Sequence, residues 1–180
     1  MRRKTHQTAR LTLRPLRRCD YATWLKAYAG GLEQQNEWDQ GPLTKNKCTL
    51  RVFTKFLLRH RRLAREDRCY IFGVFLRRTL VGMIDIAIYE RGSLQFANLG
   101  YRLFNRYWGQ GFGQEAVRAA IKIGHTDLKL QRLEASIDLH NKRSIKLVKS
   151  LGLEREGIKR GYWYQNGGWD DQLIFVARKS

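Results

Sequence analysis

The chain has 180 residues, of which 43% are hydrophobic and 12% aromatic, so it can bury a core of single-domain size and is not a disordered segment. Its 35 Lys and Arg residues against 16 acidic residues give a net charge of +19, which favours polyanionic partners. No apolar run approaches the roughly 20 residues that cross a bilayer. The three cysteines form no C-x-x-C pair and the four histidines are scattered, which predicts a cytoplasmic protein with free thiols and no metal site.

The N-terminal third predicts an edge strand and a helix. We expect residues 1–8 to be a flexible basic segment, followed by a strand at 11–15 that proline ends. Asp20 is a candidate N-cap for a helix that Gly30-Gly31 stops. One face of that helix is apolar, with Tyr21, Trp24, Leu25 and Tyr28. Residues 34–44 are polar and irregular and include Trp38.

A second helix, predicted over residues 47–65, has two contrasting faces. Its apolar face carries Val52, Phe53, Phe56, Leu57 and Leu63. A basic stripe with Arg51, Lys55, Arg59 and Arg62, ending near Glu66, lies on the other side. Such a stripe is commonly a solvated face, and with the global charge it is also compatible with a surface that faces RNA.

The rest of the chain alternates strands and helices. Strands are predicted at 69–76, 80–88, 97–104, 133–139, 154–164 and 172–177, with helices at 112–124 and 141–150. A turn at Asn166-Gly167-Gly168 joins the last two strands. No linker or repeat interrupts this pattern. We therefore predict one mixed α/β domain over residues 1–180.

The segment from Tyr107 to Ala116 holds three glycines at alternating positions, 109, 111 and 113. It lies between a predicted strand and a predicted helix. Glycine permits positive φ and close approach of a ligand to the main chain. A helix N-terminus also offers unpaired N–H groups and about half a positive charge. The pattern is compatible with a tight turn alone or with a phosphate site.

Two motifs together resemble the GNAT superfamily of N-acetyltransferases. Leu99-Gly100-Tyr101-Arg102-Leu103 precedes Trp108-Gly109-Gln110-Gly111-Phe112-Gly113, which is similar to the acetyl-CoA loop of that family. His140-Asn141-Lys142-Arg143-Ser144 precedes Leu151-Gly152-Leu153-Glu154-Arg155-Glu156-Gly157, and Gly167-Gly168-Trp169-Asp170-Asp171 resembles a C-terminal family motif. The likeness runs from about Leu11 to Lys179. Trp108, where most members have Gln or Arg, is typical of the branch that acetylates ribosomal-protein N-termini.

The resemblance implies a fold and a set of acetyl-CoA contacts. The expected fold is a mostly antiparallel mixed sheet with helices on both faces, in which the parallel strands 97–104 and 133–139 splay apart. The main chain of Tyr101, Arg102 and Leu103 would pair with the pantetheine. The pyrophosphate would bind the loop, and Asn141 and Ser144 would also contact the cofactor. The loop residues concerned are Trp108, Gly109, Gln110, Gly111, Phe112, Gly113 and Gln114.

Catalytic residues are less sharply indicated. Many family members have a tyrosine that acts as general acid seven residues after the Asn that corresponds to Asn141. In this sequence that position is Val148. We therefore expect Ser144 to protonate or hydrogen-bond the leaving thiolate. Asn141 is equally a good helix N-cap. For the base, Glu134, Asp85 and Glu115 are candidates by position, with Glu115 expected to support the helix dipole. A strand Glu that serves as base in one branch is replaced by Trp163. We take Glu134 as the base and predict that Trp38 and Asp85 bind the acceptor.

The acceptor is predicted from charge and pKa. An α-amine titrates near ~7.7–8.0 and a lysine near ~10.4, so deprotonating lysine at neutral pH costs about 3.5 kcal/mol more. A site without an evident strong base suits a protein N-terminus, and the basic surface suits a ribosomal partner and rRNA. Two alternatives stay open: a small-molecule amine acetyltransferase, disfavoured by the scarcity of acids, and a non-catalytic CoA- or RNA-binding module.

Overall fold

The computed structural model describes residues 4–165 and 167–179. Within these ranges the strands form one mostly antiparallel sheet in the order β1-β2-β3-β4-β5-β6-β8-β7, with β5 and β6 parallel. The mixed α/β class and the antiparallel sheet with one parallel pair were predicted correctly. The chain falls into two compact units, residues 1–85 with 101–119 and residues 86–100 with 120–180. The strands β4 and β5 and the helix α3 each contribute to both.

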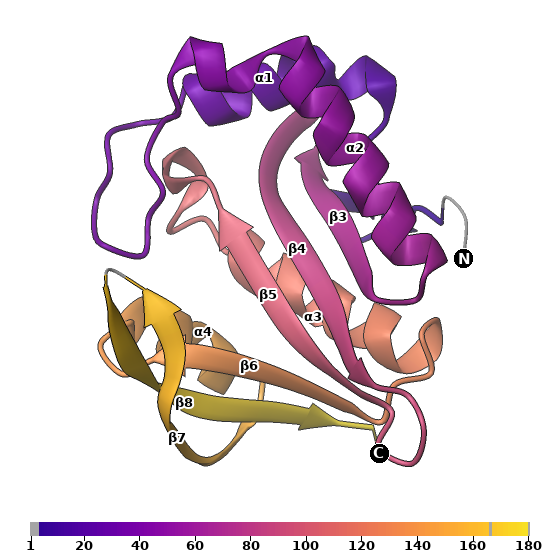
Figure 1. The fold of residues 1–180 in the computed structure, drawn as a ribbon, viewed down its shortest axis with the longest axis vertical. Coiled ribbons are helices and arrows are strands. Elements are labelled where there is room, and N and C mark those ends of the chain that lie inside the picture. The colour runs from indigo at the N-terminus through magenta and orange to yellow at the C-terminus, as the bar shows by residue number, and fades with distance from the viewer. Residues whose placement is uncertain (1–3, 166, 180) are drawn as a thin grey trace. The chain divides into compact units, whose positions relative to one another are not determined.

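The first unit contains the N-terminal strands and helices (Figure 1). Its elements are β1 (His6–Gln7), β2 (Leu11–Arg14), η1 (Arg18–Asp20), α1 (Tyr21–Ala29), η2 (Lys45–Cys48), α2 (Leu50–Arg65), β3 (Cys69–Leu76), the first part of β4 (Thr79–Glu90), the end of β5 (Phe96–Leu103), η3 (Asn105–Tyr107) and the start of α3 (Phe112–Thr126). The sequence reading placed His6 and Gln7 in a flexible segment. They form the strand that pairs with β2.

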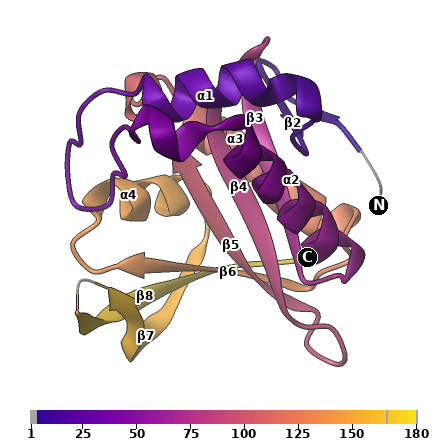
Figure 2. The ribbon, with the colours of Figure 1, turned by 45° about the horizontal axis from the view of Figure 1, so that its top comes forward.

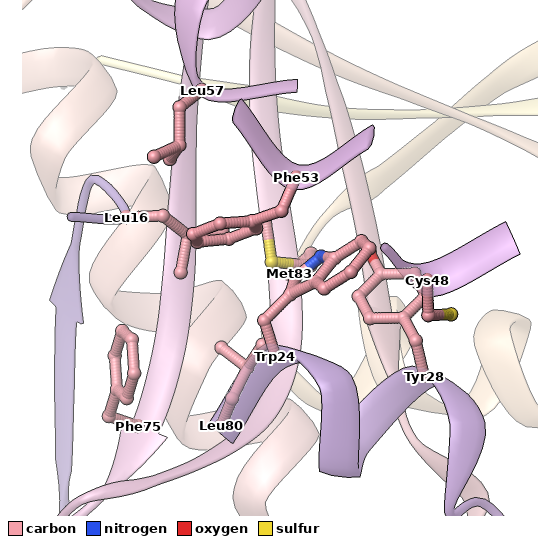
Figure 3. Packing of buried hydrophobic residues seen from close by; sticks show 9 residues of the cluster. All are labelled: Leu16, Trp24, Tyr28, Cys48, Phe53, Leu57, Phe75, Leu80 and Met83. Carbon is pink, nitrogen blue, oxygen red and sulfur yellow. The ribbon is translucent and has the colours of Figure 1, made fainter. Parts of the chain in front are cut away.

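Aromatic side chains from α1 and α2 form the core of this unit (Figure 3). Phe53 is fully buried, 5.0 Å from the Trp24 ring and 5.6 Å from the Tyr21 ring between centroids. Figure 3 also shows Met83 of β4 beside these rings, so this face of β4 points toward the two helices. The predicted apolar face of α2 is right for Phe53 and Leu57 and wrong for Val52, which is 41% exposed.

The second unit contains β6 (Arg132–Asp138), α4 (Lys142–Ser150), β7 (Glu154–Gln165) and β8 (Gly168–Arg178) with the remainders of β4, β5 and α3. Figure 2 shows α4 beside β6, after which the β7–β8 hairpin follows. The hairpin was predicted with its turn at residues 166–168, of which Asn166 lies outside the described residues. Both hairpin strands are longer than expected because their ladder continues to Gln165 and Gly168.

Asp20 is a second correction. It occupies the predicted N-cap position of α1, yet its side chain accepts from no N–H of that helix. Instead the carboxylate accepts from both terminal nitrogens of Arg14, at 2.7 and 2.8 Å, and from the main-chain N–H of Arg17. Asp20 is 6% exposed, so this bidentate pair meets the need of a buried charge for a partner.

In the described part of the chain no helix has both the length and the apolar character needed to cross a membrane.

Candidate functional site

The glycine loop of the first unit has the backbone geometry of an anion cradle. Gly109 and Gly111 have φ of 74° and 77°, in the left-handed region that favours glycine. A Cβ at Gly109 would meet nothing within 4 Å, so this main chain is open to a ligand. The described hydrogen bonds use none of the main-chain N–H groups of Gly109 to Gly113. Residues 109–113 therefore present main-chain N–H donors that have no hydrogen-bond partner among the described residues. They lead into the first turn of α3, where the positive end of the helix dipole favours an anion.

Trp108 shapes this loop from within. Its indole Nε1 donates to the main-chain oxygen of Leu103 at 2.8 Å, and its own N–H donates to Asn105 at 3.1 Å. The amide of Gln110 donates to the carbonyl of Arg106. These bonds fold residues 103–110 back onto the end of β5. The side chain of Trp108 thus closes the loop, whereas the sequence alone suggested only a ligand contact.

Arg10 stands beside the loop, and sequence reasoning missed it. Its Nη1 donates to the carbonyl of Gln110 at 3.0 Å, and its guanidinium lies 4.6 Å from the centroid of the Phe112 ring. A Cβ on Gly111 would come within 3.2 Å of its Nη2. Since Arg10 lies 100 residues before Gln110 in the chain, no motif spacing could have found it.

Glu115 positions this arginine. Its carboxylate accepts from the Arg10 main-chain N–H and Nε, both at 2.7 Å, and from the Thr8 hydroxyl. Burial opposes ionisation, but these hydrogen bonds outweigh it and lower the pKa of the Glu115 carboxyl. These contacts give Glu115 a structural role toward Arg10 and Thr8, and its support of the helix dipole stays a prediction.

The Arg10→Ala variant is expected to weaken CoA binding about 10- to 100-fold. The removed cation is placed to make a charge-assisted hydrogen bond, which contributes on the order of 1.5–3 kcal/mol. Isothermal titration with CoA measures the change. Arg17→Ala, which removes a cation from the exposed surface of the same unit, serves as the control. Equal affinities for Arg10→Ala and the wild type would exclude this role.

The end of β5 brings Arg102 to a buried tyrosine. The Arg102 Nη2 donates to the Tyr28 hydroxyl at 3.0 Å, and its guanidinium lies 5.3 Å from the Tyr28 ring centroid. Burial raises the pKa of Tyr28, and the cation only partly offsets it. Arg102 was predicted as an acetyl-CoA contact. Its side chain contacts Tyr28 of α1. The predicted contact with acetyl-CoA is therefore left to the main chain of Arg102, together with that of Tyr101 and Leu103.

Asp85, a predicted acceptor residue, lies near Arg102. Burial raises the pKa of its carboxyl, and the Arg102 charge partly offsets this shift. Within the described residues no hydrogen bond or close ion pair reaches the Asp85 carboxylate. This isolated, partly buried acid is a candidate for chemistry.

The segment that carries Trp38 is held by hydrogen bonds to Asn105, the first residue of η3. The amide nitrogen of Asn105 donates to the carbonyls of Leu32 and Glu33 and, at 2.8 Å, to the buried carboxylate of Asp39. The Trp38 indole N–H is buried and has no hydrogen-bond partner within the described residues, so its role as an acceptor contact stays a prediction. Sequence reasoning identified Trp38 but neither Asn105 nor Asp39.

In the second unit, the parallel ladder between β5 and β6 is short. It joins Phe96 to Arg132, Ala97 to Leu133 and Asn98 to Glu134, and no further pair follows although both strands continue. From the last pair, the Asn98 amide nitrogen donates to the Ser136 hydroxyl at 3.4 Å. The ladder thus ends early, as the predicted splay of these strands requires.

Asn141 is the N-cap of α4. Its side-chain oxygen accepts from the main-chain N–H of Ser144 at 3.1 Å. The structure therefore shows the predicted helix-capping role of Asn141. The cap uses only the side-chain oxygen, so the amide nitrogen can still donate to a ligand. Val148, at the position where many family members have a tyrosine general acid, is fully buried.

Glu134, the predicted base, is 1% exposed and engaged by cations. Lys159 Nζ lies 2.5 Å from one carboxylate oxygen, and Arg132 lies 3.2 Å from the other. Arg132 in turn forms two bonds to Glu156, which raise the pKa of Arg132 and lower that of Glu156. Such contacts are typical of a structural ion-pair network. The catalytic role of Glu134 stays a prediction, and its contacts favour a structural role.

Comparison with known proteins identifies the family. Residues 10–154 match the family model described as an acetyltransferase (GNAT) domain. The chain is 42% identical over 119 residues to an uncharacterised N-acetyltransferase, p20, of Bacillus licheniformis, covering 65% of this chain and 66% of the relative. It is 30% identical over 112 residues to the ribosomal protein uS5-alanine N-acetyltransferase of Escherichia coli, covering 61% and 58%. The matches thus span less than two thirds of these relatives' length.

The fold comparison agrees with the family. RimJ of Mycobacterium smegmatis, solved in complex with CoA-disulfide, superposes with a TM-score of 0.78 at 24% identity, covering 93% of this chain and 81% of that one. At this identity the likeness concerns the fold.

Proposed function

This chain belongs to the GNAT acetyltransferase family, and we propose that it transfers an acetyl group from acetyl-CoA to the N-terminal α-amine of a protein. The observation that carries the proposal is the open glycine loop, with Gly109 and Gly111 at positive φ, free N–H groups and Arg10 beside it. These features fit a doubly charged pyrophosphate better than a simple turn, because a turn needs neither free donors nor a fixed cation.

The residues present fit acetyl-CoA. The main chain of Gly109 to Gln114, with Arg10, would hold the pyrophosphate, and the end of β5 would pair with the pantetheine amides. Asn141 and Ser144 stay predicted contacts, with Ser144 also predicted to hydrogen-bond the departing thiolate. Bound acetyl-CoA supplies an activated thioester, and the protein has to bind, orient and deprotonate the amine.

A protein N-terminus suits this chemistry. An α-amine at pKa ~7.7–8.0 is partly neutral at pH 7, whereas lysine at ~10.4 is almost fully charged. Trp38, with its unpaired indole N–H, and Asp85 are the proposed acceptor contacts. A ribosomal protein is the acceptor class that we favour, because the Escherichia coli relative is named for one. Such an acceptor implies a cytoplasmic enzyme.

The proposal is tested by mass spectrometry of protein N-termini from cells with and without this chain. We expect one N-terminus, or a small set, to lose its acetyl group when the chain is absent. Unchanged N-termini with altered acetylation of a small amine would support the alternative acceptor class. No change in any amine, combined with tight CoA binding by the pure protein, would support a non-catalytic module.

The basic face of α2 supports an association with ribosomal RNA. Arg51, Lys55, Arg59, Arg62 and Arg65 lie within about a third of the helix circumference and span roughly 21 Å. Among them, in the described part of the chain, only Arg62 has an ion pair, with Glu66 at 3.8 Å. A row of cations of this length, four of the five without an ion pair among the described residues, fits a series of backbone phosphates.

Reversing three of these charges, in the variant Arg51→Glu/Arg59→Glu/Arg62→Glu, is expected to weaken binding to an rRNA hairpin and to ribosomes. If each cation contacts one phosphate, the negative slope of log affinity against log salt concentration becomes shallower by roughly 2.7, at about 0.9 per contact. The control variant Arg78→Glu/Arg118→Glu/Lys122→Glu changes the net charge equally at exposed positions elsewhere. Equal losses for both variants would assign RNA binding to the net charge alone and contradict a role for α2.

A further inference from the structure

The β7–β8 hairpin of the second unit carries an apolar face on two neighbouring strands, which Figure 2 shows side by side. Trp169 and Leu173 lie four residues apart on β8, and the ladder pairs them with Tyr164 and Ile158 of β7. Directly opposite residues of an antiparallel pair project to the same side, so these four side chains share one face. The bulges of this ladder lie in β7, which leaves the alternation along β8 unbroken.

Exposure rises along this face toward the turn of the hairpin. Phe175, on the same side of β8, is 1% exposed, whereas Ile158 is 39%, Tyr164 61% and Trp169 67% exposed. The Tyr164 and Trp169 rings lie 5.3 Å apart between centroids, so they form one continuous aromatic surface. Since an aromatic side chain can bury 150–250 Å², the two rings leave roughly 200–300 Å² in water. An exposed apolar patch of this kind, built from aromatic side chains, is typical of a protein interface.

The charge of the segment narrows the class of partner. Residues 161–171 contain no Lys or Arg and hold Asp170 and Asp171, although the whole chain has a net charge of +19. A nucleic acid needs cations along its backbone, so this segment does not suit one. An acidic protein is disfavoured in the same way. Two copies of this strongly basic chain, in contrast, repel each other least where their surfaces lack cations.

The face of the hairpin is better suited to a contact between copies than its edge. β7 is the last strand of the sheet, so its outer edge pairs with no strand in the described part of the chain. It contains two bulges and Lys159, which are features that hinder edge-to-edge pairing. Asp171, which shares the aromatic face, is already bound by the Gly161 N–H at 2.8 Å and by Arg160 at 3.2 Å. The face can therefore be covered without leaving that carboxylate unpaired.

From these observations we propose that two copies of this chain associate through the face of Tyr164 and Trp169, about a two-fold axis. Such an interface is isologous, because the same patch serves on both copies and each aromatic pair packs against that of the partner subunit. Sheets packed face to face lie about 10 Å apart, a spacing that large rings from both sides can fill. The rings supply only part of the roughly 800 Å² per partner of a standard interface, so the dimer is reversible. The inference concerns association and does not depend on the proposed acetyl transfer.

Sedimentation velocity of the full chain at about 5 and about 200 µM, a range suited to a small interface, tests the proposal. We expect the average mass of the wild type to rise from 21.2 kDa toward twice that value. Trp169→Lys should stay monomeric, because each new cation faces its own copy near the two-fold axis. Trp163→Lys is the matched control: Trp163 is 53% exposed on the opposite side of the same hairpin, and this variant should associate like the wild type. A monomeric wild type, or equal association of Trp169→Lys and wild type, overturns the proposal.

Two measurements on the wild type alone keep the test independent of how the variants fold. Added salt screens the repulsion between two chains of charge +19, so the dimer fraction should rise with salt concentration. An association that weakens with salt is ionic and contradicts the aromatic contact. Amide hydrogen exchange in peptides from residues 161–171 should slow as the protein is concentrated, while peptides from α2 stay unchanged. Slowing confined to other segments places the contact elsewhere and overturns the proposal. A monomeric wild type in which single-stranded RNA protects residues 161–171 assigns the face to nucleic acid and also overturns it.

Discussion

Replacing Gly111 with valine is expected to weaken CoA binding by at least about 100-fold. Gly111 has φ of 77°, where an L-residue costs about 1–2 kcal/mol and a β-branched one more. The new Cβ would also lie 3.2 Å from the Arg10 Nη2. The loop is expected to relieve this strain by turning its N–H groups, and each lost hydrogen bond to a phosphate removes about 1.5–3 kcal/mol. Isothermal titration with CoA measures the result.

Gly152→Val is the matched control for this prediction. Gly152 has φ of 79° and open space around its Cβ position, so the substitution imposes similar backbone strain outside the loop. It should lower the melting temperature and leave CoA affinity within a few-fold of wild type. If the two variants bind CoA equally, strain in general and not the loop geometry accounts for the effect.

Phe53→Ala is expected to lower the free energy of unfolding by about 3–5 kcal/mol. The Phe53 ring is completely buried against Trp24, Tyr21 and Leu16, and truncation leaves a cavity that close-packed rings fill poorly. Urea denaturation followed by tryptophan fluorescence measures the loss.

Leu58→Ala, on the same helix but 55% exposed, is the control for Phe53 and should change the stability by no more than about 0.5 kcal/mol. A Phe53→Ala loss below about 1.5 kcal/mol would show that the α1–α2 layer packs against the sheet more loosely than these contacts indicate.

The elements of the fold were largely predictable because their signals are local. The apolar spacing of α2, the glycines at 109 and 111 and the β7–β8 hairpin each lie within a short stretch of chain. The errors arose where the contacts of a side chain are determined by residues that lie outside the local sequence pattern. Asp20 is a good N-cap by residue type, yet Arg14 takes its carboxylate. Val52 fits the apolar face of α2 by periodicity, yet the face that the sheet covers is narrower.

The candidate site was only partly predictable for the same reason. A motif locates the loop, where the main chain offers its N–H groups, and Asn141, whose side chain caps the helix that directly follows it. The cation beside the loop, Arg10, and the Asn105–Asp39 bond that fastens the Trp38 segment join residues 66 or more positions apart, which no spacing reveals. The roles of Glu134 and Asp85 also depend on their surroundings. Both are acids on strands, but only the first is paired by cations.

The central claim is that this chain acetylates an α-amine, and the release of CoA from acetyl-CoA tests it most directly. Two peptides of the same sequence are compared at pH 7, one with a free N-terminus and no lysine, the other with a blocked N-terminus and one lysine. We expect steady CoA release and an acetylated N-terminus with the first peptide and little release with the second. Tight binding of acetyl-CoA without release for either peptide, or preferential acetylation of the lysine, would contradict the account.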